Sequence, residues 1–225
     1  MRAVLGNLVK LIETEGSEKR ALEVGCGTGN ILGKLLPMFD ETIGFDLSLD
    51  MLERAGRKWG DREDLELISG RASRLPFSED SFDLVSAYSV FHHLPDLSDP
   101  ISEISRVLKC GGILYMYHEP VRRENPGVKV YTKFCEFLRD ELRVSFPPYG
   151  KTEKDRHFCD YQIHNGDNAG IPKARIVRIV KNEGFSILAE KEYLGHRTDE
   201  SHLVHTAFSK LVDDEWILVC RMDEN

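Results

Sequence analysis

Residues 21–30 read ALEVGCGTGN, and they are the most informative stretch of this sequence. Its apolar start suits a buried strand of a parallel sheet. The glycines that follow, Gly25, Gly27 and Gly29, leave the main chain open where a Cβ would block a ligand. Apolar residues then recur at helical spacing over residues 30–39, so we expect the loop to open onto the N-terminus of a helix. A strand, a glycine turn and a helix together predict a nucleotide-binding unit.

Two classes of cofactor use such a unit, and the spacing of the glycines separates them. A dinucleotide fingerprint, G-x-G-x-x-G, would place its third glycine at position 30, where this chain has Asn30. The pattern E-x-G-x-G-x-G instead resembles motif I of the class I S-adenosylmethionine (SAM) dependent methyltransferases. A glycine turn needed only for backbone shape is the alternative. The resemblance implies that the loop binds the amino-acid end of SAM, with cofactor contacts from Glu23, Gly25, Cys26, Gly27 and Gly29.

A second strand is expected over residues 41–46, and it ends in an acid. Asp46 stands 17 residues beyond Gly29 (46 minus 29). That offset is close to the roughly 20 residues at which a strand-end acid accepts hydrogen bonds from ribose hydroxyls. Asp46 is therefore a predicted cofactor contact, with Leu47 beside it. The alternative for Asp46 is an acid at a helix N-terminus, because Ser48 can cap a helix over residues 49–58.

A longer stretch, residues 70–95, resembles the same family almost position by position. The family pattern G-D-A-x-x-L-P-F-x-x-x-S-F-D-x-V, followed by a histidine-rich turn, is matched from Gly70 onwards. With motif I and Asp46, the resemblance to a UbiE-like, type 11 methyltransferase domain covers about residues 20–120. It implies SAM as cofactor, S-adenosylhomocysteine (SAH) as product, and an α/β fold. That fold is a three-layer Rossmann-like sandwich whose seven-stranded sheet is mostly parallel with one antiparallel strand.

One position departs from the family pattern. Where the family has an acid that accepts a hydrogen bond from the adenine amino group, this chain has Arg71, which offers only donors. Arg71 can stack on the adenine face, or turn to solvent and leave the base edge to the backbone of Ala72 and Ser73. A solvated arginine with no role at the cofactor is the alternative.

The fourth predicted strand, residues 82–89, should end at the ligand crevice, so we expect Ser86 and Tyr88 to line the methionine part of SAM. His92 and His93 follow it. Either histidine can act as a general base toward a substrate hydroxyl or amine. The alternative is structural, because an H-H-L-x-D turn resembles a signature that the family has whatever its substrate.

A fifth strand is expected over residues 113–118 and ends at the same crevice. His118 is the third candidate base, and Glu119 is a candidate substrate contact together with Tyr88 and His93. A strand-end His-Glu pair can instead satisfy only the backbone of the loop.

Periodicity and glycine signals predict the remaining elements of a single domain over residues 1–225. Helices are expected over residues 2–15, over 101–109 with Asp99 as N-cap and Gly111 and Gly112 as the stop, and over 172–183. Further strands are expected over residues 65–69, 185–194 and 215–222, the last two as a hairpin.

Residues 121–170 break this pattern and are predicted to form a helical substrate cap inserted into a core of residues 1–120 and 171–225. Between residues 121 and 158 there are nine Lys or Arg and six Asp or Glu, a balance of +3, so the rest of the chain carries −8 minus 3, or −11. The contrast favours an anionic or polar-headed acceptor, although a solvated face is the alternative. The cap contributes the substrate candidates Tyr131, Tyr149 and His157. No metal is expected, because residues 157–164 lack the paired spacing of zinc ligands.

The composition is that of an ordinary globular protein with a net charge of −8 and a pI near 5.5. An acidic chain has no global basic field to displace counterions, so nucleic acid is not an expected partner. No apolar run approaches the roughly 20 residues that span a bilayer, so neither is a membrane. Five scattered cysteines without a C-x-x-C pair suit free thiols in a reducing compartment, and we expect a cytoplasmic monomer or homodimer.

Three functions remain open at this stage. The first is a SAM-dependent methyltransferase acting on a small molecule, which the acidic charge and the predicted cap favour. The second is a SAM-binding regulatory or scaffolding protein without catalysis, which Arg71 keeps open. The third, an NAD-linked dehydrogenase, is disfavoured by Asn30.

Overall fold

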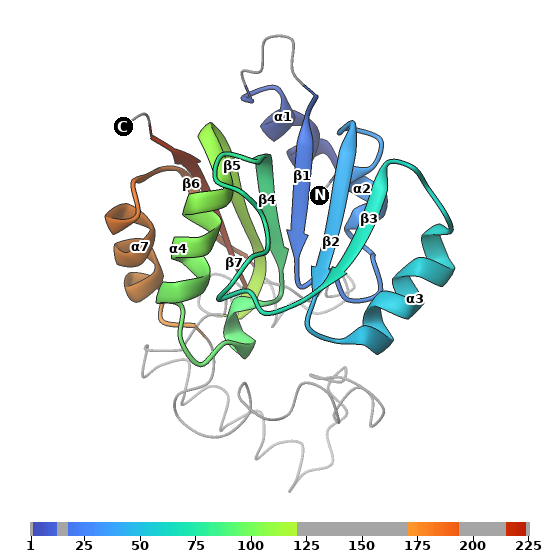
Figure 1. Ribbon diagram of the computed structural model, residues 1–225. Coiled ribbons are helices and arrows are strands. Elements are labelled where there is room, and N and C mark those ends of the chain that lie inside the picture. The colour runs from blue at the N-terminus through green and yellow to red at the C-terminus, as the bar shows by residue number, and fades with distance from the viewer. Residues whose placement is uncertain (1, 13–17, 121–170, 194–214, 224–225) are drawn as a thin grey trace, which may run out of the picture.

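Seven strands form one sheet through the centre of the protein (Figure 1). The computed structural model describes residues 2–12, 18–120, 171–193 and 215–223. The strands are β1 (Arg20–Val24), β2 (Glu41–Asp46), β3 (Leu65–Ser69), β4 (Phe82–Tyr88), β5 (Leu108–Pro120), β6 (Phe185–Tyr193) and β7 (Glu215–Met222). Their order is β3-β2-β1-β4-β5-β7-β6. β1 to β5 pair in parallel, whereas β7 is antiparallel to both β5 and β6, so the predicted sheet with one antiparallel strand is confirmed.

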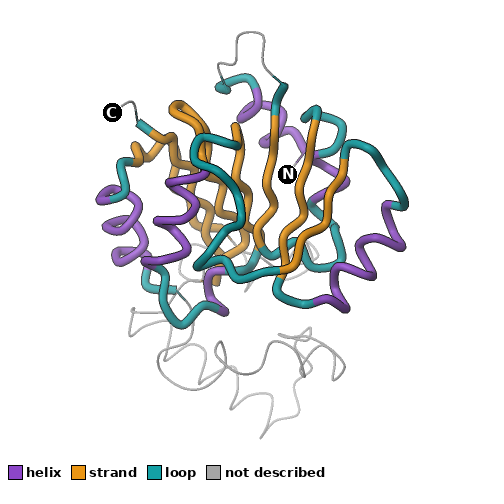
Figure 2. The backbone as a smooth tube through the Cα atoms, in the orientation of Figure 1, coloured by secondary structure: helices purple, strands orange, loops and turns teal. Residues whose placement is uncertain are grey.

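Helices cover both faces of this sheet and make three layers (Figure 2). They are α1 (Arg2–Val9), α2 (Leu32–Leu35), α3 (Leu49–Trp59), the 3₁₀ helix η1 (Phe91–His93), α4 (Ser98–Val107) and α7 (Lys173–Asn182). α4 and α7 pack on one face, where Ile104 and Ile176 meet Val85 of β4. α1 and α2 pack on the other face, and α3 joins α2 there through Leu52 and Leu32. No helix in the described ranges has the length and apolar character needed to cross a membrane.

The central strands are buried on both faces, as their sequences predict. Four of the five residues of β1 and six of the seven of β4 are buried. Along β1, Leu22 and Val24 point into the core under α4 and α7, while Ala21 points into the core under α1 and α2. Near-continuous apolar runs of this kind are typical of parallel strands covered by helices on each side.

The helix after the glycine loop is shorter than the sequence predicts. In place of a helix over residues 30–39, the chain has four helical residues, Leu32–Leu35, between turns. Pro37 has no amide hydrogen with which to continue the helical ladder, and Gly33 lowers helix propensity. The glycine loop therefore opens onto a short turn of helix, which cannot supply the dipole of a longer one.

The start of α4 also differs from the prediction. The helix begins at Ser98, and Asp99 is not its N-cap. The Asp96 carboxylate accepts hydrogen bonds from the amides of Leu97, at 2.7 Å, and Ser98, at 3.3 Å. Asp96 thus satisfies free amides at this helix start, the task that the sequence assigned to Asp99.

Two helix ends were predicted too far along the chain. α4 stops at Val107, because Leu108 already pairs with Phe82 in the sheet, and Gly111 and Gly112 lie inside β5. α1 ends at Val9 instead of residue 15. Leu11 lies in the turn after the helix and is 42% exposed.

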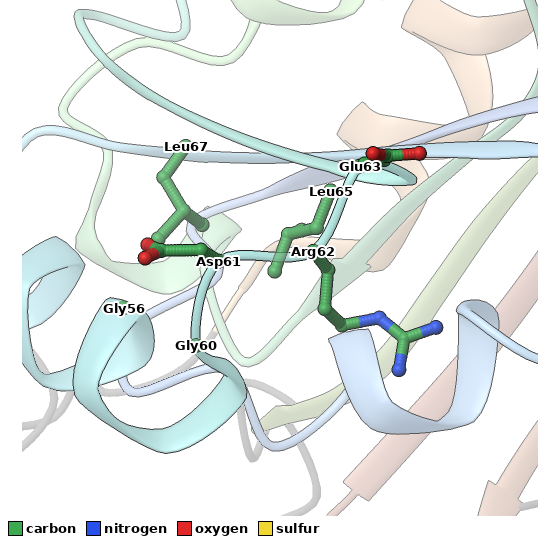
Figure 3. Close-up of a pocket in the computed structure, with 7 residues that line it drawn as sticks. All are labelled: Gly56, Gly60, Asp61, Arg62, Glu63, Leu65 and Leu67. Carbon is green, nitrogen blue, oxygen red and sulfur yellow. The ribbon is translucent and has the colours of Figure 1, made fainter.

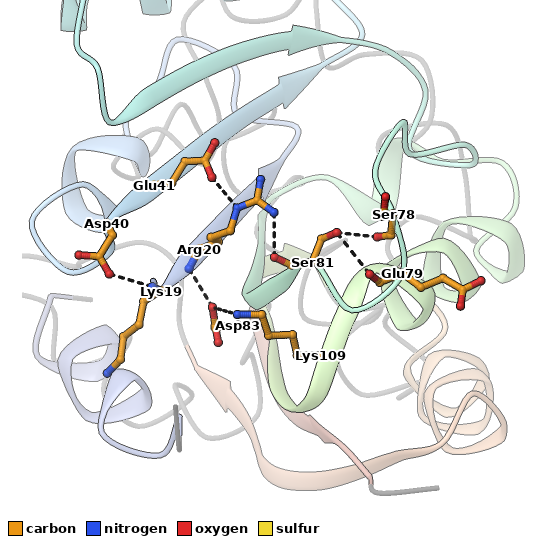
Figure 4. Close-up of polar contacts among 9 residues, drawn as sticks. All are labelled: Lys19, Arg20, Asp40, Glu41, Ser78, Glu79, Ser81, Asp83 and Lys109. Atoms are coloured by element: carbon orange, nitrogen blue, oxygen red, sulfur yellow. Dashed lines mark hydrogen bonds and ion pairs between the residues drawn. The ribbon is translucent and has the colours of Figure 1, made fainter. Parts of the chain in front are cut away.

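Polar side chains tie together the amino ends of the central strands (Figure 4). The buried Asp83 carboxylate accepts from the Arg20 amide at 2.8 Å and from Lys109 Nζ at 2.9 Å, which links β4 to β1 and β5. The Arg20 guanidinium bonds to the Glu41 carboxylate and to the Ser81 carbonyl. This edge is stabilised by internal contacts, which leaves the carboxyl edge for a ligand.

Two stretches outside the described residues, 121–170 and 194–214, are joined to the sheet at that carboxyl edge. Pro120, Glu215 and Tyr193 are register partners in a row across β5, β7 and β6. Residues 121–170 follow Pro120, and the Ile171 amide donates to the Pro120 carbonyl at 2.8 Å. The predicted cap, with Tyr131, Tyr149 and His157, therefore lies outside the described residues.

Candidate active site

The three glycines of the loop after β1 have different neighbours. All three have positive φ angles, +69° at Gly25, +51° at Gly27 and +76° at Gly29. A Cβ on Gly25 would lie 2.4 Å from a methyl group of Val90, and one on Gly29 would lie 2.6 Å from the indole nitrogen of Trp59. A Cβ on Gly27 would meet nothing within 4 Å. Where a side chain would point, only Gly27 of the three is open, whereas Gly25 and Gly29 face protein side chains there.

Asp46 connects this loop to the start of α3. Its Oδ2 accepts from the Gly27 amide at 2.8 Å, and its Oδ1 accepts from the Ser48 amide at 2.8 Å. Ser48 is the N-cap of α3, as predicted, and its hydroxyl accepts from the Met51 amide at 3.4 Å. The alternative role of Asp46, as an acid at the N-terminus of α3, is thus observed. The ribose contact stays a prediction that this geometry suits, because each carboxylate oxygen keeps a lone pair beside the open face of Gly27.

Exposed apolar side chains follow Asp46 along the chain, and the end of β3 lies beside it at the same edge. Leu47 is 66% exposed, and Leu49 is 67% exposed. The Gly70 amide donates to the Asp46 carbonyl at 3.0 Å, so Arg71, Ala72 and Ser73 follow at the end of β3. Arg71 and Ser73 are exposed and Ala72 is half-buried. An exposed apolar surface beside the backbone at the end of β3 suits a planar base.

Glu23 is a buried carboxyl group one residue before the end of β1. Neither of its oxygens has a partner in ordinary hydrogen-bond geometry among the described residues. Burial raises the pKa of Glu23 to about 8, against smaller lowering effects from the Ser86 hydroxyl, the Tyr88 backbone and Lys34. Burial likewise raises the pKa of the Cys26 thiol, so this motif cysteine stays protonated. A buried carboxyl group without such a partner, on the strand that leads into the glycine loop, suits a ligand with a positively charged amino-acid end.

Glu119 organises the turn after β4. Its carboxylate accepts from the amides of Val90 at 2.7 Å, Phe91 at 3.0 Å and His92 at 3.2 Å. It also lies 2.8 Å from His92 Nδ1, and the two side chains are 0% and 3% exposed. This geometry corresponds to the alternative in which the acid satisfies loop backbone. With a carboxylate at Nδ1, that nitrogen is the protonated one and Nε2 is the acceptor.

The other two candidate histidines lie at the carboxyl ends of β4 and β5. The exposed His93 has its ring 3.9 Å from that of His92. His118 has a φ of +63° at an irregularity in the pairing of β5 with β7. Its ring stacks on Tyr88 at 5.0 Å, and Tyr88 stacks on Tyr117 at 5.5 Å. The structure therefore brings His93, His118 and Tyr88 to the edge that holds Gly27 and Asp46.

Sequence reasoning missed Trp59, at the last position of α3. Its indole Nε1 donates to the Gly29 carbonyl at 2.7 Å, and its ring also occupies the space next to Gly33. A tryptophan at the end of an amphipathic helix predicts packing, but its partner is 30 residues away in sequence. No spacing pattern in the chain indicates that contact.

A hollow of about 400 Å³ lies away from this edge (Figure 3). It is at the amino end of β3, opposite to the carboxyl edge, and the Arg62 guanidinium beside it is paired with Asp64 at 2.6 and 2.7 Å. We assign it no role in the site. Its lining residues are Gly56, Gly60, Asp61, Arg62, Glu63, Leu65 and Leu67.

The described part of the chain contains no group of three His, Cys, Asp or Glu side chains placed to hold a metal ion. Residues 157–164, for which the sequence predicts no zinc site, are outside that part. Cys26 and Cys220 are buried free thiols, and Cys110 is an exposed one.

Comparisons with known proteins show the family to which this chain is related. A family model described as a methyltransferase domain matches residues 22–116. A demethylmenaquinone methyltransferase from Staphylococcus saprophyticus is 30% identical over 186 residues, covering 80% of this chain and 75% of that protein. A protein of the same name from Staphylococcus aureus is 38% identical over 180 residues, covering 78% of this chain and 71% of that one. A solved SAM-dependent methyltransferase from Methanosarcina mazei aligns with 99% of this chain and 98% of its own, with a TM-score of 0.65 at 20% identity, which shows a shared fold.

Proposed function

The chain belongs to the class I SAM-dependent methyltransferases, and from that premise we propose that it methylates a small-molecule acceptor at the carboxyl edge of its sheet. SAM is its cofactor and methyl transfer is its activity. The proposal concerns where SAM binds, which residues act, and what kind of acceptor is used.

The observation that carries the proposed cofactor site is the open face of Gly27 next to the Asp46 carboxylate. Gly27 lets the main chain approach a ligand, and the Asp46 carboxylate, which two backbone amides hold in place, has lone pairs left to accept hydrogen bonds. The unpartnered Glu23 carboxyl suits the amino-acid end of SAM, while exposed Leu47 and the backbone after Gly70 suit its base. The remaining contacts of the proposed site come from Gly25, Cys26, Gly29, Arg71, Ala72, Ser73, Ser86 and Tyr88.

When bound, SAM supplies a methyl group on a positively charged sulfur, and the acceptor's electron pair displaces that sulfur to leave SAH while the acceptor loses a proton. The protein mainly has to align the acceptor and exclude water. For the proton we propose His93, because it is the exposed histidine of the turn that Glu119 organises. His118 is the second candidate, and buried His92 acts as a link between Glu119 and this turn.

Two observations support a small-molecule acceptor. The relatives from Staphylococcus are named for methylation of demethylmenaquinone, a small molecule. The net charge of −8 gives the chain no basic field for a nucleic acid. An anionic or polar-headed acceptor is our finer proposal, and it rests on the +3 balance of residues 121–158. A SAM-binding protein without catalysis is not favoured, because the relatives are named as enzymes.

Calorimetric titration with SAH, with NADH and NADPH as controls, tests the cofactor site. We expect micromolar binding of SAH alone by the unmodified protein. The variant Gly27→Ala should weaken SAH binding roughly ten-fold or more. Its Cβ would occupy the open side of Gly27, and the alanine would have to adopt a positive φ.

Gly111→Ala is the matched control for backbone strain. Gly111 has a φ of +75°, and its Cβ would also meet nothing within 4 Å, but it lies at the amino end of β5, away from the loop. It should keep the SAH affinity of the unmodified chain. Equal affinity in both variants would mean that the glycine loop is not part of the cofactor site.

A screen for SAH release with anionic and aromatic hydroxyl compounds would identify the acceptor class independently of that result.

A further inference from the structure

Trp59, at the carboxyl-terminal end of α3, closes one side of the glycine loop. Its indole N–H donates to the Gly29 carbonyl at 2.7 Å. The ring fills the space where Gly29 and Gly33 lack side chains, since a Cβ on these residues would lie 2.6 Å and 2.0 Å from indole atoms. The indole therefore fills the space that side chains at positions 29 and 33 would need, and it also supplies the hydrogen-bond donor to the Gly29 carbonyl.

A neighbouring contact strengthens this attachment. Lys58 Nζ bonds to the Asn30 side-chain oxygen at 2.6 Å, and the same ammonium lies 5.2 Å from the centre of the Trp59 ring. Consecutive residues of α3 thus hold consecutive residues of the loop, Gly29 and Asn30. Inside the protein, Trp59 packs against a small apolar cluster with Cys26, Leu32 and Leu52.

The loop is consequently held on both sides of Gly27. The Gly27 amide donates to Asp46, which lies just before α3. Two residues further along the loop, the Gly29 carbonyl accepts from Trp59, which ends α3. Three glycines within five residues would otherwise populate many backbone conformations, so a loop of this composition is costly to order when a ligand binds. Fixing it in advance removes that cost.

We propose that Trp59 is a positioning residue for the cofactor: its indole N–H holds the Gly29 carbonyl and thereby keeps the open face of Gly27 directed at the ligand. The inference rests on the proposed function, because it takes the loop as the cofactor site. Trp59 itself acts through the loop and not by touching the reacting atoms.

The first test is the affinity of Trp59→Phe for SAH, measured by calorimetry. Phenylalanine keeps an aromatic ring against Gly33 but loses the N–H donor. Loss of one well-aligned hydrogen bond that preorganises the loop should weaken SAH binding roughly five- to ten-fold. The control is Trp216→Phe, which also removes an indole from a buried site, on β7, where it donates to Glu190. That variant should bind SAH as the unmodified protein does.

The second test needs no change at Trp59. The chain has two tryptophans, so Trp216→Phe leaves Trp59 as the only one. Titration of this protein with SAH should change the tryptophan emission in a saturable way, with the dissociation constant that calorimetry gives. A residue that only packs α3 against the domain would show no such change. This measurement decides the matter even where Trp59→Phe fails to fold.

The outcomes separate this inference from the proposed function. If the unmodified protein does not bind SAH, the proposed cofactor site fails and the inference fails with it. If the unmodified protein binds SAH while folded Trp59→Phe binds equally well, or while Trp59 emission stays constant through saturation, only the positioning role is overturned. Weaker binding by Trp59→Phe with a saturable emission change supports it.

Discussion

Glu23 shows how one residue in the motif sets a free-energy cost for the whole fold. Its carboxyl group is fully buried and has no partner in ordinary hydrogen-bond geometry among the described residues, and burial makes the folded protein favour the neutral acid. Buried groups of this kind are rare in proteins and concentrate at functional sites, where a ligand compensates for them. The motif glutamate is thus a cost to stability that is consistent with a role in binding.

The pH dependence of stability should reveal Glu23. Its pKa is raised from 4.5 to about 8 by burial, so between these values the unfolded chain has released a proton that the folded chain keeps. Stability from this group therefore falls as pH rises through that window, by about 1.4 kcal/mol per pH unit, and levels off above it.

Urea unfolding at pH 5, 7 and 9, carried out on the unmodified protein and on Glu23→Gln, measures this effect. The amide has no proton to lose, so the stability of Glu23→Gln relative to the unmodified protein should increase by a few kcal/mol from pH 5 to pH 9. Parallel curves for the two proteins would show that Glu23 ionises as it does in the unfolded chain.

At the scale of elements, the contact between α2 and α3 explains why Gly33 is a glycine. Gly33 lies inside α2, where alanine has the higher helix propensity, yet a Cβ there would be 2.0 Å from the Trp59 ring. The short helix and the tryptophan are therefore matched in shape. A change at one position should be felt at the other.

A double-mutant cycle between Gly33 and Trp59 tests this match. Gly33→Ala should destabilise the unmodified protein by about 1–3 kcal/mol, because the methyl group overlaps the indole. In a Trp59→Ala background the same substitution should be neutral or stabilising by up to about 1 kcal/mol, because only helix propensity remains. Denaturant midpoints of the four proteins give the coupling.

Gly6→Ala provides the control for that cycle. Gly6 is in α1, and its Cβ would meet nothing within 4 Å, so the substitution should have the same small stabilising effect with either residue at position 59. If Gly33→Ala cost the same with and without the indole, the packing argument would be refuted.

Elements that depend on local pattern were predictable from the sequence, and elements that depend on distant partners were not. β2 and β7 have the predicted bounds, and Asp46 ends β2 as predicted. The predicted helix over residues 30–39 was too long, because Pro37 has no amide hydrogen to continue it and Gly33 lowers helix propensity. The sequence predicted cofactor contacts at all three glycines, but it did not predict that Gly25 and Gly29 also leave room for Val90 and Trp59. Val90 lies in the turn after β4 and Trp59 ends α3, and no local pattern connects either residue to the loop.

The same limit applies to Glu119 and the histidines. The sequence placed His92, His118 and Glu119 at one crevice but left open whether they act on substrate or satisfy backbone. Only the three-dimensional arrangement shows that Glu119 collects three amides and His92 Nδ1. A carboxylate with four donors has its capacity used by the protein, so an acceptor is better sought at His93 and His118.

At the scale of the whole molecule, the described residues form a sheet whose strands are complete without residues 121–170. β5 ends at Pro120, the Ile171 amide bonds to the Pro120 carbonyl, and α7 follows directly. The chain thus leaves and rejoins the sheet at one point. We propose on this basis that residues 1–120 and 171–225 are the core and that residues 121–170 are an insertion that acts on the acceptor side.

Replacing residues 121–170 by a short Gly-Ser linker should leave a folded protein that binds SAH within about two-fold of the unmodified affinity, because loop-closure entropy changes little with length and Gly27, Asp46 and Trp59 all belong to the core. Methyl transfer to the acceptor should be lost. Circular dichroism, urea unfolding and SAH calorimetry measure the first expectation, and SAH release in the presence of acceptor measures the second.

A longer replacement, of residues 121–176, is the control: it removes the buried side chains of Ile171 and Ile176 and should not fold. Loss of SAH binding in the shorter replacement, with the sheet intact, would mean that residues 121–170 belong to the cofactor site itself, and the division into core and insertion would have to be abandoned.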